Sequence, residues 1–179
     1  MKQSIYFFFA LLFSSFICVA NATELPRGII TLDNQLADDF RISNDAGEQY
    51  QLKQSRGKWV MVHFWASWCG PCRREMPILY RLQQQLSNHP IDIILINTAE
   101  DEDTIFSFLG TVAPDIQSFM DKDGELTEKW APRGLPTTFF IDPQGYRRYL
   151  ALGGRDWHKP PYQKFINKLL DPSHSNNPK

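Results

Sequence analysis

Cysteine is scarce in this chain of 179 residues: only three are present, Cys18, Cys69 and Cys72. A small secreted domain that relied on disulfides for its stability would need more cysteines and would pair distant ones. A bridge between Cys69 and Cys72 closes a very small loop and therefore restricts the unfolded chain little. The scarcity excludes a disulfide-stapled scaffold and indicates that this pair is present for its reactivity.

The chain also lacks any block of basic residues. It has 19 Lys and Arg against 20 Asp and Glu, which gives a formal net charge of −1. We therefore expect no binding to nucleic acid and no electrostatic attraction to a membrane surface. With 42% hydrophobic and 13% aromatic residues, the chain is long enough for one well-buried core and short for two.

The N-terminus has the pattern of an export signal. Met1-Lys2 is a minimal basic region, the stretch 5–20 is apolar, and a small-x-small cleavage pattern ends at Ala22. We expect residues 1–22 to be a signal peptide, whose cleavage would also remove Cys18. The alternative is an uncleaved membrane anchor, but the apolar run is shorter than the roughly 20 residues that a spanning helix needs. Either way, the remainder would lie outside the cytoplasm.

Hydrophobic periodicity divides the rest of the chain into alternating strands and helices. Residues 25–40 are interpreted as a lead-in to these elements. A hairpin is expected at 39–52, strands at 58–65, 91–97, 116–120, 137–141 and 146–151, and helices at 71–87, 100–109, 126–130 and 161–170. The order predicts one α/β domain over 23–170, with a mixed sheet flanked by helices. The polar tail, 171–179, is expected to be disordered.

Two cysteines separated by two residues serve either structural zinc or redox exchange. Zinc needs four ligands, and the sequence offers neither a second cysteine pair nor histidines at ligand spacing, since the histidines are His63, His89, His158 and His174. We therefore expect no metal site. The predicted reactive group is a redox-active disulfide between Cys69 and Cys72, which needs no other cofactor.

The predicted strand-to-helix order gives the two thiols different roles. Cys69 would lie at the start of a helix, where free N–H groups and the helix dipole stabilise negative charge. Arg73 and Arg74 add positive charge one turn on, although an ordinary solvated helix face explains them equally well. These features favour a thiolate, with the pKa of Cys69 below the ordinary value of about 8.5. We expect Cys69 to attack and Cys72, one turn deeper, to resolve the mixed disulfide.

Two segments of the chain resemble signature segments of the thioredoxin superfamily. Residues 65–77, WASWCGPCRREMP, resemble its active-site segment, and residues 134–142, GLPTTFFID, resemble its later segment in the form typical of the exported TlpA/ResA-type branch. The likeness runs from about residue 36 to residue 170. It implies a thioredoxin-like fold with an N-terminal β-hairpin extension, and it implies thiol:disulfide oxidoreductase activity.

The resemblance also implies roles for individual residues. It makes Leu135–Pro136 a cis peptide that faces the cysteines, with Pro136 a member of the catalytic set. It makes Glu75, on the same helical face as Cys72, a group that handles protons, although a solvated helix glutamate is the alternative. An apolar rim around Cys69, on which partners dock, is expected from Trp68, Pro71 and Leu135.

His63 departs from the thioredoxin pattern, which has a buried aspartate six residues before the first cysteine. The departure favours Glu75 for the proton role. We interpret His63 as a core histidine and not as a catalytic residue.

The resemblance implies an exported, periplasmic reductant that a membrane electron donor keeps reduced and that acts on client protein disulfides. Reduction of apocytochrome c is one possible task. Gly70-Pro71 matches cytoplasmic thioredoxin, a reducing member at about −270 mV. The alternatives are a disulfide oxidant or isomerase, and a non-catalytic copper or metal chaperone on the same fold. We expect a monomer, which would touch a membrane only if its N-terminal segment stays uncleaved.

Overall fold

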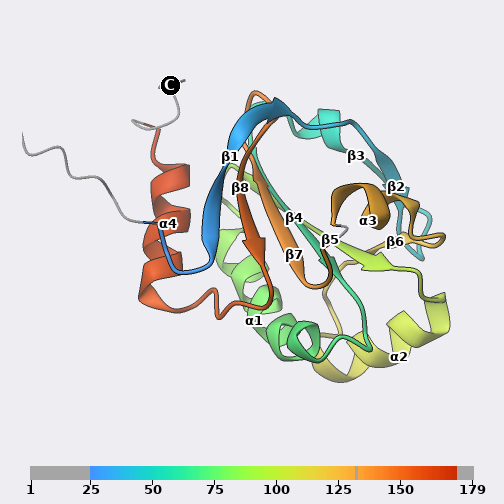
Figure 1. Ribbon diagram of the computed structural model, residues 1–179. Coiled ribbons are helices and arrows are strands. Elements are labelled where there is room, and N and C mark those ends of the chain that lie inside the picture. The colour runs from blue at the N-terminus through green and yellow to red at the C-terminus, as the bar shows by residue number, and fades with distance from the viewer. Residues whose placement is uncertain (1–24, 132, 173–179) are drawn as a thin grey trace, which may run out of the picture.

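The computed structural model describes residues 25–131 and 133–172 (Figure 1). The predicted signal peptide, 1–22, and residues 173–179 of the predicted disordered tail lie outside the described residues. The strands are β1 (Ile29–Leu36), β2 (Arg41–Ser43), β3 (Gln49–Gln51), β4 (Trp59–Trp65), β5 (Ile91–Thr98), β6 (Phe119–Asp121), β7 (Thr137–Ile141) and β8 (Tyr146–Leu152). The helices are α1 (Gly70–Leu86), α2 (Glu102–Val112), α3 (Glu125–Trp130) and α4 (Pro160–Leu170), with a 3-10 turn, η1 (Leu52–Ser55).

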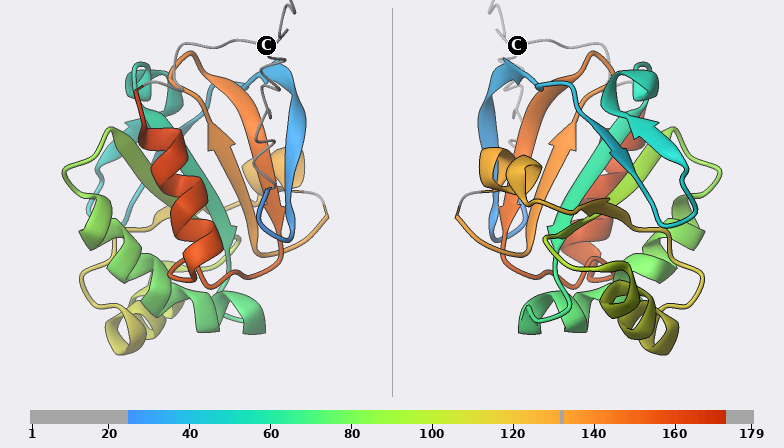
Figure 2. Two further views of the ribbon diagram at one scale, coloured as in Figure 1. Left: turned by 90° about the vertical axis from the view of Figure 1, so that its left-hand side faces the viewer. Right: turned by 90° about the vertical axis from the view of Figure 1, so that its right-hand side faces the viewer.

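The strands form one sheet in the order β1-β8-β7-β4-β5-β6-β2-β3. Strands β4, β5 and β6 run parallel to one another, and the other neighbouring pairs are antiparallel. Helices α1 and α4 cover one face of the sheet and α3 covers the other (Figures 1 and 2). This arrangement confirms the predicted α/β fold with a mixed sheet, and the β2–β3 hairpin extends one edge of it.

Strand β4 lies at the centre because its side chains are apolar on both faces. All seven of its residues are buried. Met61 and Trp65 contribute to a core cluster shared with α1, α2 and α4, whereas Val62 and Phe64 contribute to a second cluster shared with α3. The period of two along the strand therefore supplies both cores. The chain leaves the end of this strand directly toward the cysteines.

Helix α1 begins at Gly70, with Cys69 as its N-cap residue and a proline in its first turn. Pro71 suits that position because its missing N–H removes no helical hydrogen bond. The helix buries Met76, Leu79 and Leu82 completely and continues through Pro77. Packing of this apolar stripe fixes α1 against the sheet and holds its N-terminus at the end of β4.

Three predicted boundaries are wrong. Strand β1 occupies part of the predicted lead-in, 25–40. Most of its residues are exposed, so its sequence has no alternation of apolar and polar residues. It forms a strand because it pairs with β8. Helix α2 begins at Glu102 and not at Glu100, since Asp101 is its N-cap and accepts a hydrogen bond from the Thr104 backbone N–H at 2.7 Å. The strand predicted at 116–120 is β6, which begins three residues later and ends one residue later, at Asp121.

Within the part of the chain that the structure describes, no helix is both long enough and apolar enough to span a membrane.

Candidate active site

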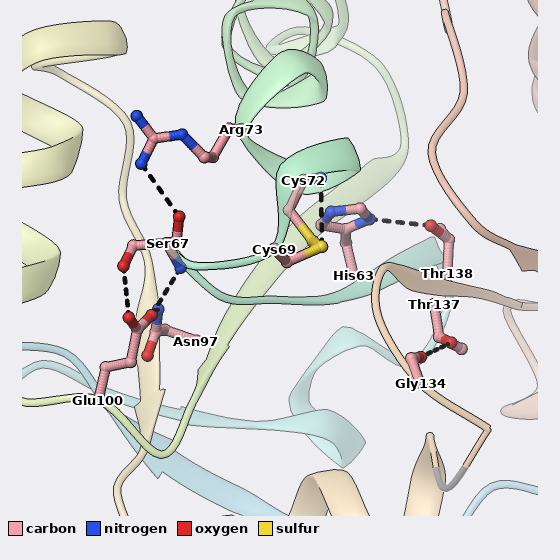
Figure 3. Close-up of a disulfide and its surroundings, with 10 residues drawn as sticks. All are labelled: His63, Ser67, Cys69, Cys72, Arg73, Asn97, Glu100, Gly134, Thr137 and Thr138. Carbon is pink, nitrogen blue, oxygen red and sulfur yellow. Dashed lines mark hydrogen bonds between the residues drawn. A yellow bond between two sulfur atoms is a disulfide. The ribbon is translucent and has the colours of Figure 1, made fainter.

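The cysteine pair lies where β4 gives way to α1. A tight turn follows the strand, in which the Cys69 backbone N–H donates to the Ala66 carbonyl at 3.2 Å. The Cys69 Sγ atom accepts a hydrogen bond from the Cys72 backbone N–H at 3.3 Å (Figure 3). One free N–H group of the first helical turn, that of Cys72, is thus directed at the Cys69 sulfur.

Cys69 and Cys72 form a disulfide, and their Cα atoms are 5.2 Å apart. Cys69 is 5% exposed and Cys72 is fully buried, which agrees with an outer attacking thiol and an inner resolving one. Beside them Trp68 is 68% exposed, Pro71 is exposed and Leu135 is half-buried. Trp68 therefore presents most of its surface to solvent.

The segment before β7 reaches the same end of the sheet. Leu135–Pro136 is a cis peptide, which confirms the prediction. Thr137 lies opposite Phe64 in the register of β7 with β4, so Pro136 lies at the level where β4 ends and the cysteine loop begins. Leu135 also packs against the core cluster that contains both cysteines. The structure thus brings the two motifs of the sequence together.

Glu75 is buried one turn after Cys72, with 2% of its surface exposed. Its Oε1 atom accepts a hydrogen bond from the Trp157 indole N–H, and its Oε2 atom has no partner among the described residues. Gly154 lies close by, since a β-carbon built there would be 3.3 Å from Glu75 Oε2. The alternative of a solvated helix glutamate is wrong for this residue.

Burial raises the pKa of Glu75 to about 8, because a carboxylate loses its hydration there, while the Trp157 hydrogen bond and Arg155 pull the pKa back down. Both protonation states are therefore accessible at and just above neutral pH. A group that donates and accepts a proton during turnover needs such a pKa.

His63 lies on the β4 face that α1 covers, together with Met61 and Trp65. Its Nδ1 atom is 2.9 Å from the Thr138 hydroxyl, and its Nε2 atom has no partner among the described residues. Burial lowers the pKa of His63 to about 3, so the imidazole is neutral at physiological pH. The predicted position of His63 in the core is confirmed.

Four residues at this end of the sheet had no functional role in the sequence analysis. Glu100 accepts hydrogen bonds from Ser67 and Asn97 (Figure 3). The Trp157 indole N–H donates to Glu75. Ser67 and Glu100 are 33 positions apart, and Glu75 and Trp157 are 82 apart. No sequence signal links partners at such separations. Among residues 25–131 and 133–172, no group of three His, Cys, Asp or Glu side chains could hold a metal ion.

A disulfide at a helix N-terminus, next to a cis-proline segment on a mixed sheet flanked by helices, defines a thioredoxin-like thiol:disulfide oxidoreductase. The chain belongs to the Redoxin family, whose model matches residues 32–166.

Relatives support the same class and the ResA-like branch. Thiol-disulfide oxidoreductase ResA from Bacillus thuringiensis subsp. konkukian is 28% identical over 134 residues, which cover 72% of this chain and 78% of the relative. The chain spans only 61% of the length of ResA from Bacillus subtilis.

Two solved structures are similar in fold and sequence. A thiol:disulfide interchange protein DsbE from Chlorobium tepidum has a TM-score of 0.70 at 28% identity, covering 78% of this chain and 99% of that one. A protein disulfide isomerase from Bacteroides thetaiotaomicron has a TM-score of 0.68 at 27% identity, covering 82% and 95%.

Proposed function

We propose that this chain is an exported reductant of client protein disulfides that reacts through Cys69 and Cys72. The observation that carries the proposal is the asymmetry of the pair, since Cys69 at the helix start is 5% exposed and Cys72 beneath it is fully buried. An incoming disulfide therefore meets Cys69 first. The exposed Trp68 and Pro71 and the half-buried Leu135 form the docking rim that we propose for the client.

The proposed reaction has two exchange steps. In the reduced protein the Cys69 thiolate attacks one sulfur of the client disulfide, so that a mixed disulfide forms and one client thiolate leaves. Cys72, after losing its proton, then attacks the Cys69 sulfur and releases the second client thiolate. The client gains two electrons, and its two thiolates take up one proton from Cys72 and one from solvent, because Cys69 reacts as the thiolate. The protein is left with the Cys69–Cys72 disulfide.

We propose that Glu75 exchanges the proton of Cys72. Both residues are buried on one face of α1, separated by three positions. The free Oε2 atom and a pKa of about 8 support this role. Pro136 completes the proposed catalytic set as the residue beside which an extended client segment would lie.

The direction of electron flow and the location rest on the sequence. Gly70-Pro71 between the cysteines matches reducing thioredoxins, and residues 1–22 carry the export pattern. The proposed place of action is the periplasm, where a membrane electron donor would have to restore the dithiol because that compartment is oxidising. Apocytochrome c, whose two cysteines must be reduced before haem attachment, is the client that we propose.

The reduction potential of the purified mature chain against glutathione tests the proposal. We expect a value near the reducing end of the range, and a value above about −150 mV would show an oxidant instead. Trapping the thiols in intact cells is the second measurement, and a largely reduced pair is expected. An oxidised Cys-x-x-Cys-His peptide should be reduced faster than an unrelated disulfide peptide if apocytochrome c is the client.

An isomerase is the second candidate, because one similar solved structure is described as a protein disulfide isomerase. An isomerase would restore activity to a substrate protein with scrambled disulfides, whereas a reductant would only reduce it. Copper titration of the reduced chain separates both from the metal chaperone, which would bind the metal stoichiometrically and exchange thiols poorly.

A further inference from the structure

Glu100 lies in the short connection between β5 and α2, next to an unusual backbone conformation. Its neighbour Ala99 has a φ of 53°, and within residues 25–131 and 133–172 no other residue except glycine has a positive φ. The left-handed conformation is unfavourable for alanine because its β-carbon crowds the backbone. The turn directs Glu100 away from α2 and toward the cysteine loop.

The Glu100 carboxylate accepts hydrogen bonds from three donors (Figure 3). The Ser67 backbone N–H donates at 2.7 Å and the Ser67 hydroxyl donates to the other carboxylate oxygen. The Asn97 side-chain amide donates at 2.7 Å. We call Ser67, Asn97 and Glu100 the loop clasp.

Ser67 is also held from its other side. Its carbonyl oxygen accepts a hydrogen bond from Arg73 Nη1 at 3.2 Å, and the Arg73 guanidinium lies over the Phe108 ring at 5.0 Å from the centroid. Every polar atom of Ser67 is thus bonded, two residues before Cys69. The loop that carries the attacking sulfur is fixed between a carboxylate and a guanidinium.

Two features at the loop clasp lower the stability of the fold. One is the left-handed conformation of Ala99, the residue next to Glu100. The other is Asn97, which is buried and whose Oδ1 atom has no partner among the described residues. Unfavourable local features of this kind collect where geometry serves function. Their coincidence at the residues that hold the cysteine loop points to the positioning of Cys69.

We propose that the loop clasp is a positioning device for thiol–disulfide exchange, which holds Cys69 in register with Cys72 and so raises their effective concentration toward each other. The proposal rests on the function proposed above for this pair. In the dithiol form an unclasped loop would let Cys69 move away from Cys72, and ring closure would lose part of its intramolecular advantage. Glu100 is a positioning residue because it acts through Ser67. Among the described residues its carboxylate bonds Ser67 and Asn97 and makes no hydrogen bond to either sulfur atom.

The equilibrium with glutathione tests the clasp. One glutathione disulfide is reduced to two thiols as Cys69 and Cys72 are oxidised, so the equilibrium constant measures the effective concentration of the pair. For Glu100→Ala we expect this constant to fall about tenfold, and for Ser67→Ala, which keeps the backbone donor, about threefold. Glu102→Gln is the matched control, since Glu102 is an exposed acid two positions on that pairs with Lys122. It should leave the constant unchanged.

Thermal unfolding of the oxidised and reduced forms separates positioning from a merely structural role. If the clasp positions Cys69, Ser67→Ala and Glu100→Ala destabilise the oxidised form more than the reduced form. Equal losses in both forms, with an equilibrium constant within twofold of wild type, would overturn the proposal. Should Glu100→Ala fail to fold, Ser67→Ala decides alone. A wild-type chain that does not exchange with glutathione would instead contradict the proposed function.

Discussion

Two glutamates flank the cysteine pair, and their surroundings differ in almost every respect. Glu75 is 2% exposed, one of its oxygens accepts a single hydrogen bond, and the other oxygen has no partner among the described residues. Glu100 is half-buried, and its two oxygens share three donors from Ser67 and Asn97.

The difference in surroundings suits the two glutamates to the two different roles proposed for them. Withdrawal from water without enough donors raises the pKa of Glu75 to about 8, so this carboxyl group can gain and lose a proton near neutral pH. A carboxylate that accepts three hydrogen bonds is suited to holding a loop, since charge-assisted bonds are short and directional. We propose that one side of the cysteine pair serves proton exchange and that the other side holds the loop in place.

The largest expected effect comes from removing the thiols that lie between the two glutamates. Cys69→Ser should lower the rate of exchange with a disulfide substrate by about a thousandfold or more, because the nucleophile is lost. Cys72→Ser should retain the first attack and accumulate a mixed disulfide, visible by mass spectrometry of the intact chain. If Cys72→Ser lost the first attack and Cys69→Ser kept it, the two thiols would have the opposite roles, and Glu75 would lie beside the nucleophile.

Glu75→Gln sharpens the comparison by removing the titrating group while keeping an oxygen for Trp157. The pKa of Glu75 is about 8 in the folded chain against an ordinary 4.5, so the folded state keeps a proton that the unfolded state has lost between these pH values. The contribution of Glu75 to the free energy of unfolding therefore falls as pH rises from 4.5 to 8 and is level outside this window.

The Gln variant lacks this fall, and its stability relative to the wild type should increase across the window, by an amount on the order of 2–4 kcal/mol at its upper end. Denaturant unfolding of the oxidised chain at several pH values measures it. The exchange rate should fall about tenfold at neutral pH through the lost proton transfer. Glu102→Gln is the control, and a stability difference that does not change with pH would contradict the shifted pKa.

The two glutamates also show which features of the site can be predicted from the sequence. The apolar run of β4 and the Cys-x-x-Cys segment follow from local patterns, whereas the cis Leu135–Pro136 peptide was implied by the resemblance to the thioredoxin superfamily. All three are confirmed. Glu75 was a candidate because its spacing from Cys72 along a helix is a local quantity. Its burial against Trp157 was not predictable, because their contact joins residues 82 positions apart.

Glu100 was misassigned for a related reason. It begins a run of four acids, Glu100 to Asp103, and acids at a helix N-terminus are stabilised by the dipole, so the whole run was predicted as a helix start. Only Asp101 and the two acids after it serve α2 in that way. Glu100 leaves the helix start and bonds Ser67, which lies on a loop 33 positions earlier. The sequence of the four acids alone therefore does not indicate which of them lies outside α2.

The smallest expected effect tests the hydrogen bond that the Trp157 indole N–H donates to Glu75. In the wild type the Trp157 indole N–H lowers the pKa of Glu75 by stabilising its charged form. Trp157→Phe removes this donor, so the pKa of Glu75 should rise from about 8 by up to about one unit. The inflection in the pH dependence of the exchange rate should move upward by the same amount, and carboxyl NMR of the labelled side chain should follow it. Trp59→Phe is the matched control. The Trp59 indole N–H is buried and has no hydrogen-bond partner among the described residues, so removing it takes no hydrogen bond from Glu75. Equal inflections in all three chains would mean that Trp157 only fills space, and the proton affinity of Glu75 would then rest on burial alone.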